Sequence, residues 1–258
     1  MLGLDAKNPA IVLRDADLEL TVKEAVAGAL SFNGQRCTAL KILFVERSVA
    51  DAFVQKLSEA ISALQLGLPW TDKVQITPLP EPGKVDFLQG LIADAVTLGA
   101  KVINPQGGQS SGSLMRPALL YPVNSQMRLY QEEQFGPLVP VVPYDDISEV
   151  IHYVIHSDFG QQLSIFGQDA RQIGELVDMF ANQVGRININ SQCQRSPDSF
   201  PFTGRKNSAE GTLSVEDALL QFSIPTLVAC KYNPEQIALM KEMIKQGSSQ
   251  FLATDFLF

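Results

Sequence analysis

The sequence has few of the residues that build disulfide frameworks and metal sites. It contains three cysteines, an odd number at wide spacing, and only two histidines. Disulfide frameworks and structural zinc sites usually show closely paired cysteines or mixed Cys/His sets. We therefore expect no disulfide framework, no metal site, and a reducing compartment, the cytoplasm.

Long apolar runs and an excess of positive charge are also missing. No run of about 18 apolar residues predicts a membrane span, and the N-terminus lacks the basic and then apolar layout of a signal peptide. The formal net charge is −8. Such a surface repels phosphate backbones and anionic lipids. We expect neither nucleic acid nor a membrane as a partner.

The two histidines, His152 and His156, stand four residues apart in a run with helical periodicity, 147–156. Side chains at this spacing share a helix face and can bind a metal ion, but no HExxH pattern accompanies them. A solvated or capping role is more common for such a pair, and we expect it here.

Apolar runs alternate with helical patterns along most of the chain. Strand-like runs occupy 10–13, 40–45, 101–103, 118–121, 137–142, 163–166 and 186–190. Apolar residues recur at helical spacing over 18–32, 49–64, 84–98, 147–156 and 170–182. This alternation predicts an α/β fold with a mainly parallel sheet flanked by helices. The proline-rich stretch 68–83 and the Gly/Ser-rich stretch 106–113 are predicted loops.

The C-terminal part has its own pattern. Residues 222–229 are predicted to form a final strand, and residues 234–245 an amphipathic helix. The last residues, 251–258, are very apolar for a free tail. We expect them to dock on another surface.

Cys37 lies where a predicted helix ends and a strand begins. Asn33 and Gly34 tolerate the left-handed backbone that often ends a helix, so Cys37 should sit on a tight, exposed turn. A thiolate is intrinsically nucleophilic and its acyl adduct is reactive, which suits thioester catalysis. Taken alone, a single cysteine is more often an inert core residue. We keep that interpretation for Cys193 and Cys230.

Four segments, in this order, resemble motifs of the aldehyde dehydrogenase superfamily. They are Ala6-Lys7-Asn8-Pro9 with Asp15-Ala16-Asp17, Asn33-Gly34-Gln35-Arg36-Cys37-Thr38, Glu132-Glu133-Gln134-Phe135-Gly136-Pro137, and Asn188-Ile189-Asn190 with the loop 200–208. The chain therefore looks like the C-terminal catalytic half of a superfamily member. Within the superfamily, Gln35 to Thr38 and the segment 188–202 most resemble the non-phosphorylating, NADP-dependent glyceraldehyde-3-phosphate dehydrogenases.

The resemblance implies roles for five residues. Cys37 would be the acylating nucleophile, Glu133 would hold the nicotinamide ribose hydroxyls, and Phe135 would contact the nicotinamide ring. Arg36 and Arg195 would bind a substrate phosphate, which guanidinium groups can pair bidentately. The implied reaction oxidises an aldehyde, glyceraldehyde 3-phosphate, to its acid with NADP or NAD. Solvated arginines and a glutamate pair before a Gly-Pro turn are the plain alternatives.

Two features depart from the superfamily pattern. The family's general base is a glutamate four residues before the lysine that Lys7 matches, but Gly3 stands there, between Leu2 and Leu4, with Asp5 the only nearby carboxylate. Either Asp5 or another group activates water, or hydrolysis is poor. Family members are also much longer, and no glycine-rich phosphate-binding fingerprint occurs here. We expect an incomplete cofactor site and an isolated chain without turnover.

These observations divide the chain into three predicted parts. Residues 1–13 would be a remnant of the cofactor domain or a linker, 14–220 the catalytic thiol domain, and 221–258 an oligomerisation strand with a helical tail. The strand 222–229 resembles one that family members lend to a partner subunit, so we expect a homo-oligomer. The alternative is a non-catalytic relative that serves as an oligomerisation module. The missing glutamate favours that alternative, and the intact Cys37 and Glu133 motifs oppose it.

Overall fold

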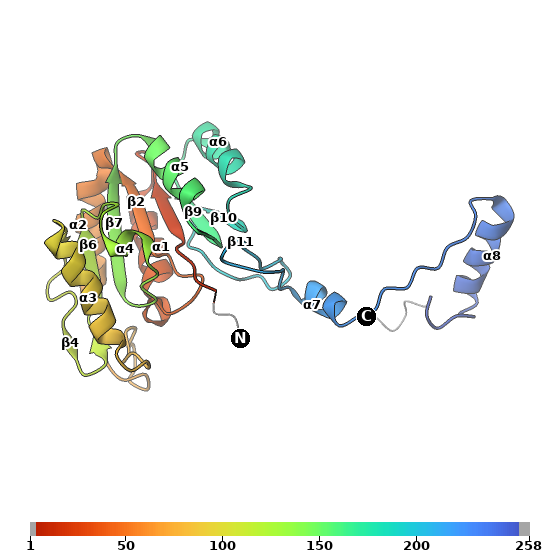
Figure 1. Ribbon diagram of the computed structural model, residues 1–258, viewed down its shortest axis with the longest axis horizontal. Coiled ribbons are helices and arrows are strands. Elements are labelled where there is room, and N and C mark those ends of the chain that lie inside the picture. Colours follow the sequence, from red (N-terminus) through yellow and green to blue (C-terminus); the bar gives the residue numbers. More distant parts are fainter. Residues whose placement is uncertain (1–3, 253–258) are drawn as a thin grey trace. The chain divides into compact units, whose positions relative to one another are not determined.

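A seven-stranded sheet forms the centre of the first of two units into which the chain divides, Met1–Ala218 and Leu219–Phe258 (Figure 1). The computed structural model describes residues 4–252. The strands are β1 (Pro9–Val12), β2 (Ile42–Glu46), β3 (Lys101–Val102), β6 (Ala118–Tyr121), β7 (Leu138–Tyr144), β9 (Gln162–Phe166) and β10 (Arg186–Ile189). Their order is β10-β9-β1-β2-β7-β6-β3, and every neighbouring pair is parallel except β3 with β6. The predicted mainly parallel α/β sheet is confirmed.

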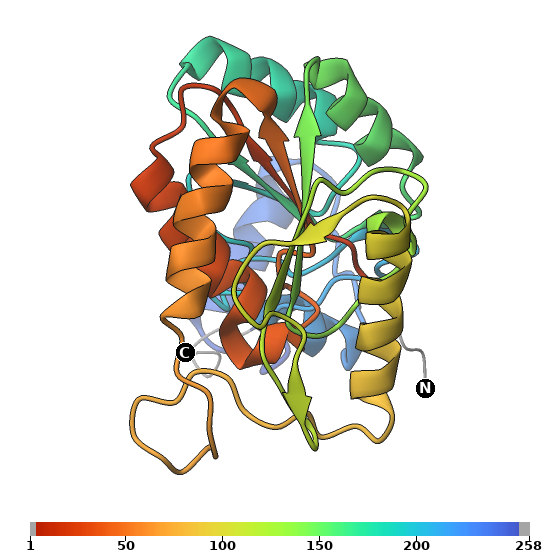
Figure 2. The ribbon, with the colours of Figure 1, turned by 90° about the vertical axis from the view of Figure 1, so that its left-hand side faces the viewer.

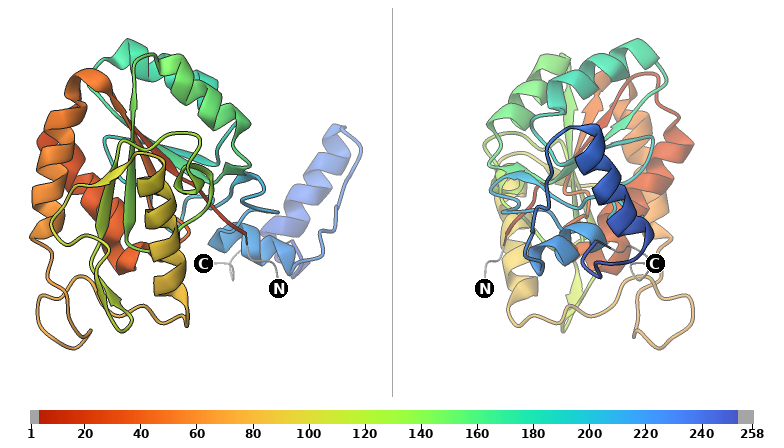
Figure 3. Two further views of the ribbon diagram at one scale, coloured as in Figure 1. Left: turned by 60° about the vertical axis from the view of Figure 1, so that its left-hand side comes forward. Right: turned by 90° about the vertical axis from the view of Figure 1, so that its right-hand side faces the viewer.

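Helices cover both faces of the sheet, and each face has its own apolar core. Helices α1 (Leu18–Leu30) and α2 (Arg47–Ser62) lie on one face, while α3 (Lys84–Thr97), α5 (Ile147–His156) and α6 (Ala170–Phe180) lie on the other (Figures 2 and 3). Successive strand residues point to opposite faces. Ile11 of β1 accordingly joins one core, while Ala10 and Val12 join the other. A strand buried on both sides needs the continuous apolar run that the sequence shows.

The helix before Cys37 begins as predicted and ends early. The Asp17 carboxylate accepts the N–H groups of Glu19 and Leu20, which caps α1. The helix stops at Leu30, and a short 3-10 turn, η1 (Ser31–Gly34), replaces its predicted last residues. Asn33 and Gly34 have φ angles of 59° and 69°, which confirms their left-handed backbone. Phe32 adopts the same conformation, with φ 55°.

Helix α5 has the predicted bounds and carries the two histidines on one face. Asp146 and Glu149 form a reciprocal capping box at its start. The rings of His152 and His156 stack with their centroids 3.9 Å apart. The expected shared face is therefore present.

Several short elements were not predicted from the sequence. They are the hairpin of β4 (Ser110–Ser111) and β5 (Leu114–Met115), the ladder of β8 (Phe159–Gly160) with β11 (Arg205–Lys206), and the helices α4 (Arg128–Gln131) and α7 (Val215–Gln221). The hairpin lies in the stretch predicted as a Gly/Ser loop. Elements of two to seven residues are too short to show a hydrophobic period.

The second unit contains the predicted helix but not the predicted strand. Helix α8 (Pro234–Lys245) is capped by Asn233, whose side chain accepts the Gln236 N–H at 2.9 Å. Residues 222–229 have no strand hydrogen bonds, so the prediction of a strand there is wrong for the single chain. A strand needs a neighbour, and this segment pairs with none of the described residues. Docking of the apolar tail involves residues 253–258, which lie outside the described part. No described helix is long and apolar enough to cross a bilayer.

Candidate active site

The predicted site segments meet at the amino ends of four neighbouring strands. Asn8 precedes β1, Cys37 and Lys41 precede β2, Glu133 precedes β7, and Gln162 opens β9. Because parallel strands begin at the same edge of a sheet, segments far apart in sequence come together there. Open α/β sheets more often bind ligands beyond the carboxyl ends of their strands. This site lies at the opposite edge, where the strands begin, so the general rule for open α/β sheets does not predict its position.

Cys37 lies on the predicted turn, with its side chain exposed. Its carbonyl oxygen accepts hydrogen bonds from Asn8 Nδ2 at 2.8 Å and Lys41 Nζ at 3.0 Å. Among residues 4–252, no group accepts a hydrogen bond from the Cys37 N–H. The turn is therefore fixed through its carbonyl, while the N–H beside the sulfur stays available to stabilise an oxyanion.

Gly34 lets the Cys37 motif pack directly on the Glu133 motif. A Cβ atom on Gly34 would lie 2.6 Å from the carbonyl oxygen of Ala29 and 2.7 Å from that of Gly136. The positive φ of Gly34 is a second reason for glycine at this position. A side chain here would push the two motifs apart.

A buried lysine joins the Cys37 turn to Glu133. Lys41 Nζ lies 2.6 Å from Glu133 Oε1 and also donates to the carbonyls of Arg36 at 3.2 Å and Cys37 at 3.0 Å. The Lys41 side chain is 1% exposed and that of Glu133 13%. Burial lowers the pKa of Lys41, and the Glu133 carboxylate opposes that shift. Three acceptors, one of them anionic, match the three donors of an ammonium group.

Lys7 is also buried near this pair but has different partners. Its Nζ donates to Glu132 O at 2.6 Å and to Gln134 Oε1 at 2.7 Å, and Gln134 Nε2 donates to Lys41 O at 2.9 Å. Burial holds the pKa of Lys7 well below its usual value, and the charge of Lys41 lowers it further. Lys41 thus contacts a carboxylate, whereas Lys7 bonds neutral acceptors and holds the segment that carries Glu133.

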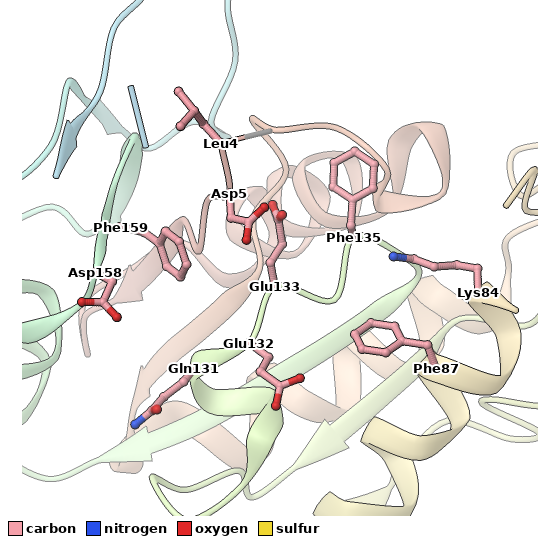
Figure 4. Close-up of a pocket in the computed structure, with 10 residues that line it drawn as sticks. All are labelled: Leu4, Asp5, Lys84, Phe87, Gln131, Glu132, Glu133, Phe135, Asp158 and Phe159. Carbon is pink, nitrogen blue, oxygen red and sulfur yellow. The ribbon is translucent and has the colours of Figure 1, made fainter. Parts of the chain in front are cut away.

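A cleft of 690 Å³ opens beside Glu133 (Figure 4). Its lining includes Glu133, Phe135, Phe87, Lys84 and Asp5. Figure 4 shows the carboxylates of Asp5 and Glu133 reaching into the same part of the cleft. On the other side, Lys84 Nζ lies 5.0 Å from the centre of the Phe87 ring and 5.7 Å from that of Phe135. The volume is typical of a small-molecule site.

The structure brings Glu133 and Phe135 together in this cleft, but Cys37 is not among the residues that line it. The link to Cys37 runs through Lys41, which contacts both Glu133 and the Cys37 carbonyl. Phe135 has a φ of 40°, an unusual backbone for a non-glycine residue. Gly3, where the superfamily's general base would stand, lies outside the described residues. Asp5 lies in the cleft beside Glu133.

The two predicted phosphate ligands lie on different segments. Arg36 Nη2 donates to the carbonyls of Ala27 and Gly28 and to Gln192 Oε1, at 2.9–3.2 Å. Its Nε is buried without a partner among the described residues, and burial lowers its pKa. Arg195 is 59% exposed, lies 3.7 Å from Asp198 and covers the Phe202 ring. The Arg36–Gln192 hydrogen bond joins the two segments, and no direct contact joins the two guanidinium groups.

The other two cysteines differ from each other. Cys193 is buried, with its Sγ 3.4 Å from Ser164 Oγ and 3.6 Å from Asn188 Nδ2. Burial raises the pKa of its thiol to about 11, which agrees with the inert role expected for it. Cys230 is exposed in the second unit, so its assignment to a core is wrong.

Sequence reasoning missed the polar residues that hold the site together. Asn8 bonds both the Cys37 carbonyl and the Gln162 N–H, and Gln162 in turn bonds the N–H and carbonyl of Gln194. Lys41 joins the turn to Glu133. Each of these residues directly precedes or opens an apolar strand. A polar residue directly before a continuous apolar run is a signal in the sequence, but it does not distinguish such residues from solvated strand ends.

The first unit is a three-layer α/β domain with an exposed thiol on a strand-entry turn and, linked to that turn through Lys41, a carboxylate in an aromatic cleft. Residues 1–228 match the model of the aldehyde dehydrogenase family, and the chain belongs to that family. The resemblance found in the four motifs is therefore confirmed.

Three relatives illustrate the likeness. The NADP-dependent glyceraldehyde-3-phosphate dehydrogenase of Streptococcus equinus is 37% identical over 92% of this chain and 48% of that protein. A crystal structure of the NADP-dependent glyceraldehyde-3-phosphate dehydrogenase of Bacillus halodurans C-125 with NADP matches with TM-score 0.79 and 41% identity, over 83% of this chain and 44% of that one. A salicylaldehyde dehydrogenase of Pseudomonas putida G7 with salicylaldehyde matches with TM-score 0.80 and 31% identity, over 90% and 49%. The chain thus spans about half the length of these relatives.

Proposed function

We propose that this chain is the catalytic part of an NADP- or NAD-dependent aldehyde dehydrogenase that oxidises glyceraldehyde 3-phosphate to its acid through a thioester on Cys37. The observation that carries the proposal is the exposed Cys37 turn, held by Asn8 and Lys41 at the edge that also presents Glu133. The proposed substrate is the one named in relatives that are 37% and 41% identical to this chain.

The first step of the proposed reaction uses groups of this chain. The Cys37 thiolate attacks the aldehyde carbon, the C–S bond forms, and the oxyanion lies beside the Cys37 N–H. The bound dinucleotide supplies the hydride acceptor that turns this adduct into a thioester. Water then attacks the thioester carbon, the C–S bond breaks, and the carboxylate product leaves as the Cys37 thiolate is regenerated and two protons pass to solvent. Cys37 is unchanged over the cycle.

The cleft fits the nicotinamide ribose end of such a cofactor. Oε1 of Glu133 is occupied by Lys41 and the Ala6 N–H, whereas no described residue bonds its Oε2. That oxygen can accept a ribose hydroxyl, and Phe135 supplies an aromatic face in the same cleft. Orientation of this kind is most of what hydride transfer asks of a protein.

Arg36 and Arg195 are the proposed phosphate ligands. The unpartnered Nε of Arg36 and the exposed guanidinium of Arg195 both have donors to offer. Asp198 competes for Arg195, so substrate would have to displace a weak surface pair.

Hydrolysis of the thioester is proposed to be slow. The carboxylate nearest the expected base position, Asp5, lies in the cofactor cleft rather than beside Cys37. We also propose that the 258-residue chain alone does not turn over, because it presents only the nicotinamide end of a cofactor site. A free catalytic thiol fits a reducing compartment, the cytoplasm.

A homo-oligomer is proposed from the exposed apolar side chains of Phe222, Ile224 and Leu227. These residues lie on the segment expected to add to a sheet edge of a partner subunit. Strand β10 offers such an edge, since it pairs only with β9 among the described residues. The same apolar segment favours the second candidate function, a non-catalytic oligomerisation module.

The two functions separate in an aldehyde-protection experiment. Alkylation of Cys37 is followed by peptide mapping in the presence of glyceraldehyde 3-phosphate, glyceraldehyde or salicylaldehyde. Reversible addition of an aldehyde to the thiolate blocks alkylation, and we expect the phosphorylated aldehyde to protect at the lowest concentration. Arg195→Ala should remove that preference, while Arg205→Ala, on β11, serves as the matched control. Protection by none of the aldehydes would support the module.

A further inference from the structure

Lys41 uses all its hydrogen-bonding capacity within the site. Two of its donors go to the carbonyls of Arg36 and Cys37, which form the nucleophile turn, and the third goes to Glu133. With 1% of its side chain exposed, water does not compete for these bonds. Among residues 4–252, Lys41 is therefore the one side chain that contacts both the Cys37 turn and the proposed ribose carboxylate.

We propose that Lys41 is a positioning residue that couples Glu133 to the Cys37 turn, so that a change at the Glu133 carboxylate alters the reactivity of the Cys37 thiol. The coupling has a functional meaning only if the proposed function holds, in which Glu133 receives ribose hydroxyls. Binding at Glu133 would then be felt at the nucleophile without direct contact between cofactor and sulfur.

The electrostatics of the site support a coupling through Lys41. A thiolate at Cys37 raises the pKa of Lys41, as Glu133 does, so the ammonium interacts with both groups. When two anions share one buried cation, removing the charge of one anion changes how strongly the cation stabilises the other. Two other charged groups lie near this pair. Lys7 and Lys41 repel each other when both carry a charge, and Arg36 interacts electrostatically with a Cys37 thiolate.

The geometry also separates Lys41 from an ordinary packing residue. A packing residue would affect stability but not the pH dependence of thiol alkylation. Asn8 bonds the same Cys37 carbonyl without carrying charge or touching Glu133. Only the lysine offers a path by which the charge at Glu133 reaches the turn.

The test is a double-mutant cycle on the full chain without cofactor. The rate of Cys37 alkylation by iodoacetamide is measured from pH 6 to pH 10 by peptide mapping in wild type, Lys41→Met, Glu133→Gln and the double variant. Glu132→Gln is the matched control, because the Glu132 side chain pairs with Arg128 and its only contact with the two buried lysines is a backbone carbonyl. Near-UV circular dichroism checks that each variant is folded.

Lys41→Met should slow alkylation at pH 7 about tenfold and change the shape of the pH profile, because it removes the buried cation that contacts the Cys37 turn. Glu133→Gln should change the rate at least threefold, Glu132→Gln should not, and the double variant should match Lys41→Met. Persistence of the Glu133→Gln effect in the Lys41→Met background would overturn the coupling. If Lys41→Met does not fold, equal rates in Glu133→Gln and Glu132→Gln would overturn it instead.

Selective labelling of Cys37 over Cys230 tests the proposed function separately, since the cycle compares only the alkylation rates of Cys37.

Discussion

The amino edge of the sheet, where β1, β2, β7 and β9 begin, buries charged side chains, whereas the segment 219–232 exposes apolar ones. The edge buries two lysines, a residue type that proteins rarely bury, and leaves only 13% of the Glu133 side chain exposed. The segment exposes large apolar side chains, with Phe222 at 93% and Ile224 at 92%. Both arrangements cost free energy in an isolated domain.

The two regions differ in where the compensating partners lie. At the edge, Lys7 and Lys41 find all their acceptors inside the chain. Along 219–232, the apolar side chains find no cover among the described residues. Buried charged groups whose partners all lie within the chain indicate a functional site of the domain itself. Exposed apolar side chains without cover indicate a surface that binds another molecule. The predictions below test each half of this contrast.

The largest expected effect comes from breaking the buried pair. Lys41→Met leaves the Glu133 carboxylate without its cation, and we expect the free energy of unfolding to fall by about 3–5 kcal/mol. Urea denaturation followed by circular dichroism measures it. Lys56→Met is the control, because Lys56 pairs with Glu19 on the exposed surface and should leave the midpoint unchanged. If both variants lost the same free energy of unfolding, the Lys41–Glu133 pair at the sheet edge would be no more stabilising than an exposed surface pair.

The exposed segment should respond in the opposite way. Replacing Ile224 and Leu227 together by serine should weaken self-association by at least about 100-fold, because each apolar side chain contributes about 1.5–3 kcal/mol when buried. Unfolding stability of the first unit should not change. Light scattering over a concentration series measures association, with Thr226→Ser as a control in the same segment. A wild-type chain that stays monomeric at all concentrations would contradict the proposed surface.

A smaller effect should appear in the pH dependence of stability. The folded-state pKa of Lys7 lies well below its unfolded value, so the unfolded chain binds the proton more tightly. The stabilising contribution is therefore fully present above about pH 10.4 and is lost as pH falls through the folded pKa. In that window the stability of wild type relative to Lys7→Met should rise with pH by up to about 1.4 kcal/mol per unit. Urea midpoints from pH 7 to pH 10 measure the slope, and a flat difference would mean that Lys7 keeps its proton.

The smallest difference concerns two exposed thiols, one from each region. Cys37 adjoins Arg36 and lies near Lys41, whereas Cys230 lies in the apolar segment. Cationic neighbours favour the reactive thiolate, so Cys37 should be alkylated about fivefold to tenfold faster. Buried Cys193, with its thiol pKa near 11, should be slowest. Limited alkylation and peptide mapping give the order, and faster labelling of Cys230 would count against Cys37 as the activated thiol.

Most of the fold could be predicted because its elements are long and periodic. The central strands and five main helices lie within a few residues of the predicted bounds, since each strand is apolar on both faces and each helix has an apolar stripe. The segment 222–229 was predicted as a strand from its apolar run and from its resemblance to a strand that family members lend to a partner subunit. Its apolar residues lack a neighbour in the chain, and composition does not reveal a missing neighbour.

The site could be predicted only where motifs named its residues. Cys37, Glu133 and Phe135 follow from the motifs, and the structure places the last two in one cleft. Lys41 could not be predicted in this way, because a lysine beside an apolar run is usually a solvated strand end. Its burial depends on Glu133, which lies far along the sequence and arrives only through the order of the parallel strands.

The most direct test of the central claim is acylation of the thiol by an activated ester. The full chain is mixed with p-nitrophenyl acetate, release of nitrophenolate is followed, and the acetylated peptide is identified by mass spectrometry. The ester needs no cofactor, so the test does not depend on a complete dinucleotide site. We predict a burst of about one nitrophenolate per chain, a long-lived acetyl group on Cys37, and loss of both in Cys37→Ser. Acetylation of Cys230 or of lysines instead, with the burst unchanged in Cys37→Ser, would contradict the assignment of Cys37 as the nucleophile.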